Sequence, residues 1–192
     1  MFRRRRKQRD RKIGQLYFAT SNENKFREVR KILGMPIRQA HVKMDELQLW
    51  DIREVAVHKV KQAYDQLKRP VFVEDTALYI NSLNRFPGAF ITWVERTIGN
   101  KGLLKLLEDK EFRFAQARSV IAYCDGKELQ VFVGVVKGKI TEEERGGGWG
   151  FDPIFIPADY KQTYGEMGER KKNEISHRRK AIEKFKKWLR RK

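Results

Sequence analysis

Apolar residues in the first part of the chain alternate between a short continuous run and helical spacing. The run at 16–19 gives way to the polar stretch 20–22, and Gly34 and Pro36 close the region. Between them, apolar residues recur three or four positions apart, at Phe26, Val29, Ile32 and Leu33. This order predicts a strand, a polar turn and a helix.

A second helix is indicated between positions 52 and 67. One face of it is apolar over about four turns, through Ile52, Val55, Ala56, Val60, Ala63, Tyr64 and Leu67. Pro70 ends this segment, and the apolar run 71–73 that follows is typical of a short buried strand. The run leads directly into Glu74, Asp75 and Thr76, so we expect these three residues at the end of that strand.

The second half of the chain has the pattern of a hairpin between helices. A short helix is expected after Gly99, and the segments 112–123 and 129–140 read as strands joined by the turn 124–127. The chain closes with a helix whose apolar face is Ala181, Ile182, Phe185, Trp188 and Leu189. With no internal repeat or linker, this order predicts one α/β domain over 13–192, built on a mixed sheet flanked by helices.

Composition narrows the class of protein. The chain has 192 residues, 40% of them hydrophobic, which suffices for one sizeable core and excludes a disordered chain. The single cysteine, Cys124, excludes a disulfide framework and a cysteine-based zinc site. No apolar run approaches the roughly 20 residues of a membrane span, and the apolar stretch 13–19 is too short for a secretory signal. We therefore expect a soluble cytoplasmic protein without a membrane partner.

The net charge of +18 is concentrated at the two ends of the chain. Residues 1–12, a basic N-terminal extension, carry eight Lys/Arg against one Asp, and residues 170–192 carry twelve against two Glu. The body between them is close to neutral, which favours solvated basic ends with a weak attraction to nucleic acid. A nucleic-acid-binding protein that acts through these ends is the alternative from a different class, and it would bind with strong salt dependence.

Four segments combine residue types suited to nucleotide chemistry. The first follows the predicted strand and opens a helix, where backbone N–H groups favour an anion and a lysine adds charge for phosphate. It lacks the glycines of a P-loop, and an ordinary helix cap by Ser21 or Asn22 is the competing interpretation. Its residues are Thr20, Ser21, Asn22, Glu23, Asn24 and Lys25.

The second segment is acidic. Glu74 and Asp75, with Glu46 as a third carboxylate, form a sparse acidic group of the kind that holds Mg²⁺ beside substrate phosphates while one carboxylate handles a proton. The competing interpretation is that these acidic residues only form a turn at the end of the strand.

The other two segments offer an aromatic side chain and a group of donors. Trp149, in the glycine-rich segment 146–153, is suited to stacking on a base, unless it only anchors a loop. Lys172, His177 and Arg178 surround Ser176, which can cap the last helix. We expect them to direct donors outward from the helix end, where they would accept a keto oxygen and reject an exocyclic amino group. A basic first turn in a basic helix is the competing interpretation.

In this order, the segments resemble the Ham1 family of inosine/xanthosine triphosphate pyrophosphatases, over about residues 16–189. The resemblance rests on Thr20-x-Asn22-x-x-Lys25, Val73-Glu74-Asp75-Thr76, Phe86-Pro87-Gly88, Gly150-Phe151-Asp152-Pro153-Ile154-Phe155, Tyr164-Gly165-Glu166-Met167 and Lys172 through Arg178.

The resemblance implies a long mixed sheet with two lobes around a central active-site cleft, usually in a homodimer. It implies hydrolysis of ITP, XTP or dITP to the monophosphate and pyrophosphate by water, with one divalent cation per subunit, Mg²⁺ or else Mn²⁺. By position, Asp75 is the catalytic base, Glu46 and Asp75 serve the metal with Glu74 as a further candidate, and 20–25 bind phosphates. Thr76 would touch the substrate, and the base pocket would be Trp149, Gly150, Phe151, Asp152, Lys172, His177 and Arg178.

The chain departs from the family pattern at two places. The family commonly has Phe-Gly-Trp/Tyr-Asp where this chain has Trp149-Gly150-Phe151-Asp152, an exchange expected to keep stacking. The usual Pro-Glu-x-Gln-Gly is half kept at 45–49, around Glu46. A pyrophosphatase for another modified nucleotide remains a second alternative.

Overall fold

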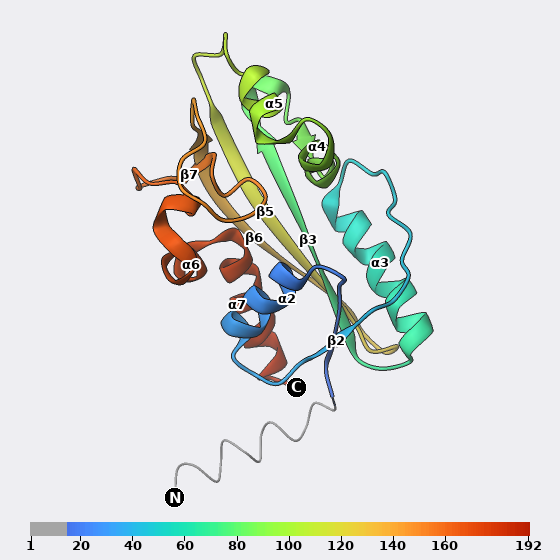
Figure 1. The fold of residues 1–192 in the computed structure, drawn as a ribbon. Helices are drawn as coiled ribbons and strands as arrows, with labels where there is room; N and C mark the ends of the chain where they lie inside the picture. The colour runs from blue at the N-terminus through green and yellow to red at the C-terminus, as the bar shows by residue number, and fades with distance from the viewer. Residues whose placement is uncertain (1–14) are drawn as a thin grey trace, which may run out of the picture.

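The computed structural model describes residues 15–192, and the basic extension expected at 1–12 lies outside them (Figure 1). Within these residues, seven strands form one mixed sheet in the order β2-β1-β3-β5-β6-β7, with β4 paired to β3. Strand β1 (Tyr17–Ala19) is parallel to β2 (Arg38–Ala40) and to β3 (Val71–Ile80), and the other pairs are antiparallel. The predicted mixed α/β architecture is confirmed.

The centre of the sheet is the predicted hairpin. Its strands are β5 (Phe114–Cys124) and β6 (Leu129–Ile140), which pair from Phe114 opposite Lys139 to Cys124 opposite Leu129. At the turn, Asp125 Oδ1 accepts hydrogen bonds from the backbone N–H groups of Lys127 and Glu128. The short strands β4 (Pro87–Gly88) and β7 (Phe155–Pro157) complete the sheet.

Strand β3 is much longer than the sequence pattern predicts. We expected it to end after residue 73, but it continues to Ile80 and pairs with β5 along its whole length. The polar triplet 74–76 that we interpreted as a strand end is followed by the buried run 77–80, which continues the strand. Glu74 and Asp75 therefore lie in the middle of a strand, and their side chains point to opposite faces of the sheet.

Helices cover both faces of the sheet (Figure 1). Helix α3 lies on one face, α2 and α7 lie on the other, and α4 and α5 lie at one end of the long strands. The helices are α2 (Glu23–Leu33), α3 (Ile52–Leu67), α4 (Ile91–Thr97), α5 (Gly99–Lys105), α6 (Tyr164–Ile175) and α7 (His177–Leu189), with a 3-10 turn at Asn81–Leu83. None of the helices described is long and apolar enough to cross a bilayer.

The helices expected near 23–33, 52–67, 99–107 and 177–189 are confirmed, whereas α4 and α6 were not predicted. Helix α6 begins with a capping box, in which Thr163 Oγ1 accepts from Glu166 N and the Glu166 side chain accepts from Thr163 N. This Thr-x-x-Glu pattern is visible in the sequence and marks a helix start.

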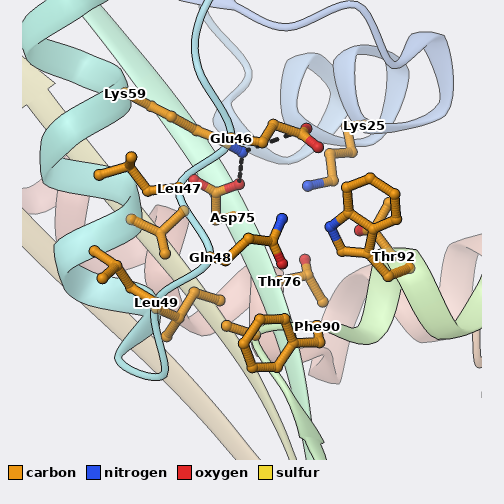
Figure 2. Close-up of a pocket in the computed structure, with 14 residues that line it drawn as sticks. Lys25, Glu46, Leu47, Gln48, Leu49, Lys59, Asp75, Thr76, Phe90 and Thr92 are labelled. Atoms are coloured by element: carbon orange, nitrogen blue, oxygen red, sulfur yellow. Dashed lines mark hydrogen bonds and ion pairs between the residues drawn. The ribbon is translucent and has the colours of Figure 1, made fainter.

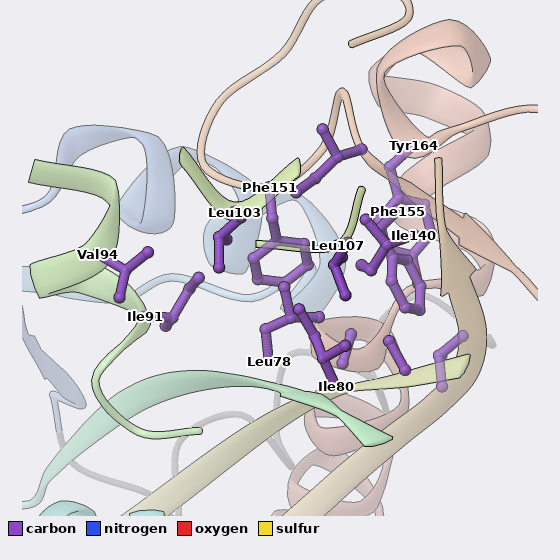
Figure 3. Packing of buried hydrophobic residues seen from close by; sticks show 14 residues of the cluster. Leu78, Ile80, Ile91, Val94, Leu103, Leu107, Ile140, Phe151, Phe155 and Tyr164 are labelled. Atoms are coloured by element: carbon purple, nitrogen blue, oxygen red, sulfur yellow. The ribbon is translucent and has the colours of Figure 1, made fainter. Parts of the chain in front are cut away.

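Three apolar clusters stabilise the sheet. Figure 3 shows the cluster beneath α4 and α5, which includes Leu78, Ile80 and Phe155. The second cluster joins β1 and β3 to α2 and α7, with Phe72 and Phe185 in contact, and the third lies under α3. On one face of β3, Phe72 belongs to the second cluster and Leu78 to the first, so Glu74 and Thr76 lie between the two cores.

Helix α7 packs on the sheet through direct backbone contact at Gly134 of β6. A Cβ atom at this position would collide with the carbonyl oxygen of His177 and the backbone nitrogen of Ala181. Further along α7, Lys180 Nζ and Lys184 Nζ donate to the carbonyl oxygens of Val135 and Val133, at 3.2 and 2.6 Å. The close approach at Gly134 fixes the start of α7.

The C-terminal residue is held against the hairpin turn. Lys192 Nζ donates to Asp125 Oδ2 at 2.6 Å and lies 3.1 Å from Glu128 Oε2. Partial burial alone would raise the pKa of Asp125, but the hydrogen bonds from Lys192 and from two backbone N–H groups lower that pKa to about 2.

We expect Gly134→Ala to lower the free energy of unfolding by about 1–3 kcal/mol, because the added methyl group displaces the first turn of α7. Urea unfolding measures this change. Gly147→Ala is the matched control, since a Cβ there meets nothing within 4 Å. Equal stability of the two variants would show that α7 tolerates a side chain at 134.

We expect the ion pair between Asp125 and Lys192 to weaken in acid. Because the pKa of Asp125 is lower in the folded protein than in the unfolded chain, its stabilisation is present above about pH 4 and is lost as the pH falls toward 2. In urea titrations at several pH values, the difference in stability between the native protein and Lys192→Met should shrink across this range. The control is Lys187→Met, at an exposed lysine on α7 with no acidic partner among residues 15–192. A difference for Lys192→Met that stays constant with pH contradicts the assignment.

Candidate active site

A cleft opens beside the middle of β3 (Figure 2). Helix α2 contributes Lys25, α3 contributes Lys59, and β3 contributes Asp75 and Thr76. The segment 46–49 before α3, and Phe90, Thr92 and Trp93 at the start of α4, also line it. The cleft thus brings together four predicted site residues from distant parts of the chain: Lys25, Glu46, Asp75 and Thr76.

Lys59 lies between the two carboxylates predicted to serve a metal. Its Nζ donates to Asp75 Oδ1 at 2.8 Å and lies 3.7 Å from Glu46 Oε1 (Figure 2). Burial alone would lower the pKa of Lys59, but Asp75 outweighs that effect and raises it. Lys59 was not predicted, although its position four residues after Val55 places a charge on the face of α3 that is otherwise apolar.

Asp75 has one carboxylate oxygen left for other chemistry. Its Oδ2 atom is buried and has no hydrogen-bond partner in the part of the chain that is described. No group of three or more His, Cys, Asp or Glu side chains suited to a metal occurs within residues 15–192. A divalent cation at this position would therefore depend on Glu46, Asp75, water and ligand oxygens, which is the sparse coordination typical of Mg²⁺.

The predicted phosphate-binding segment forms the N-terminus of α2. Asn22 is the cap, because its Oδ1 accepts from Lys25 N at 3.0 Å and its N–H donates to Thr20 Oγ1 at 3.1 Å. Lys25 Nζ donates to the carbonyl oxygen of Glu74 and lies 3.2 Å from Glu74 Oε2. The segment thus places a cation at the cleft.

Three other residues of this segment do not meet the cleft residues. Ser21 is exposed. The Glu23 side chain accepts from Gln39, and the Asn24 side chain accepts from Arg27.

A buried network of charges adjoins the cleft. Arg178 donates to Glu28 through Nη1 and to Thr76 Oγ1 through Nη2, and its Nε lies 3.3 Å from Glu74 Oε1. Lys172 Nζ lies 2.7 Å from Glu28 Oε1 and 2.6 Å from Asp152 Oδ2. These contacts join α2, β3, α6 and α7 at one place.

The network sets the protonation of its acids. Burial alone would raise the pKa of Glu28 and of Glu74, but Arg178 foremost, with Lys172 beside Glu28 and Lys25 beside Glu74, holds both below their ordinary values. For Asp152, burial prevails over Lys172 and raises the pKa. Glu74 Oε1 also accepts hydrogen bonds from Ser119 and Thr76, so donors and the cations of Lys25 and Arg178 lie close to its carboxylate.

His177 and Arg178 face inward. We expected them to point outward from the start of α7, but each is only 1% exposed, because both pack inside the network. Burial lowers the pKa of His177 well below its ordinary value, so the imidazole is neutral near pH 7. Neither of its ring nitrogens has a hydrogen-bond partner among the described residues. A buried imidazole with both nitrogens unpaired is able to bind polar groups of a ligand.

The two aromatic residues of the segment 149–152 have different roles. Trp149 Nε1 donates to Glu28 Oε1 at 3.1 Å, and the cations of Lys172 and Arg178 lie 4.8 and 5.0 Å from its ring centroid. Phe151 instead packs in the apolar core against Phe155. Of the two aromatic rings that the chain exchanges relative to the family pattern, only that of Trp149 lies among the charged side chains of the network.

Glu28 is the main site residue that sequence reasoning missed. It follows the apolar Phe26 by two positions and precedes Ile32 by four, so it is an acid on the buried side of α2. A charged residue in a buried stripe requires a partner. That signal was available in the sequence, although the identity of the partners was not.

Comparison with known proteins agrees with this geometry. The family model described as the Ham1 family matches residues 16–188. A dITP/XTP pyrophosphatase of Methanosarcina acetivorans is 43% identical, covering 91% of this chain and 96% of its own, and one of Thermococcus kodakarensis is 44% identical with the same coverage. A Ham1 protein structure from Coxiella burnetii is 29% identical with a TM-score of 0.82, covering 93% of this chain and 99% of its own. The chain therefore belongs to the Ham1 family.

Proposed function

We propose that this protein hydrolyses non-canonical purine nucleoside triphosphates, such as ITP, XTP and dITP, to the monophosphate and pyrophosphate. Its relatives named dITP/XTP pyrophosphatase match nearly the whole chain. The observation that carries the proposal is the meeting of two groups on β3. Arg178, which follows His177, contacts Glu74 and Thr76. Asp75 lies between these two residues in β3, and its Oδ2 has no hydrogen-bond partner among the described residues.

The donors favour a 6-keto purine. Lys172 and Arg178 only donate hydrogen bonds, and neutral His177 has one N–H to give. A keto oxygen accepts from such groups, whereas an exocyclic amino group leaves donor facing donor and costs about 1–3 kcal/mol per unpaired group. Trp149 supplies an aromatic face beside them.

The opposite end of the substrate would lie at α2. Lys25 and the backbone N–H groups that follow Asn22 supply positive charge for the triphosphate. Thr20 and the other residues up to 25 complete this proposed phosphate site. Thr76 of β3 lies between the proposed phosphate site and the base pocket.

Glu46 and Asp75 would hold one divalent cation, Mg²⁺ or Mn²⁺. When bound, this cation would neutralise part of the negative charge of the substrate phosphates. Glu74 is less suited to the metal, because Arg178 and Lys25 already pair with its buried carboxylate.

Asp75 would act as the proton acceptor for the attacking water. Lys59 holds Oδ1 in place, which leaves the unpaired Oδ2 to accept the proton. The ammonium of Lys59 also lies 3.7 Å from Glu46 Oε1, so it lies close to both carboxylates proposed to hold the cation.

We also propose a homodimer in the cytoplasm, where nucleoside triphosphates are held. The end of the molecule at α4 and α5 carries large exposed apolar side chains, and such groups mark interaction sites. They are Ile98, Leu106, Phe112 and Phe114. Sedimentation equilibrium tests this assembly.

A substrate panel tests the proposed selectivity. With Mg²⁺ present, we expect kcat/KM for ITP, XTP and dITP to exceed that for ATP by about tenfold or more, because the buried donors reject the 6-amino group. Release of monophosphate and pyrophosphate is the measurement, with and without the cation. Equal rates on ITP and ATP contradict the selectivity.

Asp75→Asn tests the proton acceptor. We expect kcat to fall by about 10²–10⁴-fold, since the amide cannot take a proton, while substrate still binds. Turnover with saturating Mg²⁺ and calorimetric binding separate the two effects. Asp65→Asn is the control, at an exposed aspartate of α3. Retained turnover in Asp75→Asn removes this residue from the proposed role.

A further inference from the structure

Glu95 of α4 has a carboxylate with no assigned role. It is partly buried, and among residues 15–192 it makes no hydrogen bond and no ion pair. It follows Thr92, which lines the cleft, by three positions, so the two side chains are neighbours on one side of α4. Partial burial raises its pKa. A carboxylate in such a position is available to a ligand.

Charged residues from both ends of the proposed site influence Glu95. Lys25, Asp152 and Arg178 all act electrostatically on Glu95. Lys25 marks the proposed phosphate end, and Asp152 and Arg178 mark the base end. The part of a nucleotide that joins these two ends is the sugar, and Glu95 lies beside Gly150 in the loop of the base end.

The loop opposite leaves room for that sugar. A Cβ atom at Gly150 would lie 2.9 Å from Glu95 Oε1, so a side chain at position 150 would fill the space before the carboxylate. Asn100 Nδ2 donates to the carbonyl oxygen of Gly150 at 3.0 Å, which ties the loop to the end of the molecule that carries Glu95. Glycine at 150 therefore leaves the carboxylate uncovered on the side of this loop.

The chemistry of the carboxylate narrows the ligand group. A carboxylate only accepts hydrogen bonds, and it repels phosphate. Sugar hydroxyls are neutral donors, and acidic side chains bind them in other nucleotide sites. The substrates proposed above include ribonucleotides and a deoxyribonucleotide, and the hydroxyl they share is the 3′-OH.

We propose that Glu95 accepts a hydrogen bond from the 3′-hydroxyl of the nucleotide sugar and thereby determines specificity for the sugar. The proposal rests on the proposed function, because the cleft must hold a nucleoside triphosphate. It adds a contact to the sugar, which none of the other site residues supplies.

The test compares dITP with 2′,3′-dideoxyinosine triphosphate, which differ only in this hydroxyl. We expect the native protein to have a kcat/KM about ten- to a hundredfold higher for dITP, as for loss of a hydrogen bond to a charged group. In Glu95→Ala this ratio should fall to near one, through loss on dITP with little change on the dideoxy compound. Glu108→Ala, at an exposed acid on the same end of the molecule, should keep the native ratio.

The inference is overturned if the native protein has the same kcat/KM for dITP and the dideoxy compound. It is also overturned if Glu95→Ala lowers kcat/KM equally for both compounds, or if it changes the ratio of kcat/KM for ITP to that for XTP instead. Thermal unfolding of the variant checks its fold. Calorimetric binding of dIMP and 2′,3′-dideoxyinosine monophosphate gives the same comparison without turnover. If no nucleotide releases pyrophosphate, the proposed function fails, whereas equal use of both sugars overturns only the contact to Glu95.

Discussion

The buried guanidinium of Arg178 is the group on which the arrangement of the site depends. It contacts Glu28 of α2 and Glu74 and Thr76 of β3, while Lys172 joins Glu28 to Asp152. Three carboxylates, Glu28, Glu74 and Asp152, are thus balanced by the cations of Lys25, Lys172 and Arg178. Removing one partner of such a buried pair typically costs about 3–5 kcal/mol, so the helices and β3 are held in one relative position.

The alternation of side chains along β3 divides the site into two compartments. Asp75 points to the α3 side, where Lys59 and Glu46 lie, and Glu74 points to the side of α2 and α7. A single strand therefore carries the proposed proton acceptor on one face and the anchor of the base pocket on the other. A turn at this position would not hold the two carboxylates apart in this way, because only the extended backbone fixes their opposite directions.

Apolar periodicity predicted the elements that bury a simple stripe, which is why α2, α3, α7 and the β5–β6 hairpin were found. The same periodicity failed to predict elements in which a charged residue interrupts the run of buried apolar positions. Strand β3 was expected to end at Glu74, because the cation that compensates this acid is Arg178, 104 positions later in the chain, and no local pattern reveals it. Glu28 and Lys59 were missed for the same reason. The family resemblance supplied the residue roles, and those roles stay predictions.

The two lysines of α7 that contact β6 also affect the tendency of the protein to aggregate in a concentrated solution. Strand β7 pairs only with the end of β6, at residues 138–140, so the carbonyl groups of Val133 and Val135 have no neighbouring strand of the sheet to pair with. An uncovered strand edge is a template on which another chain can add a strand and begin aggregation. Lys180 and Lys184 occupy the carbonyl oxygens of Val135 and Val133 and place charge along that edge. Part of the basic C-terminus thus protects the sheet from growing beyond its own molecule.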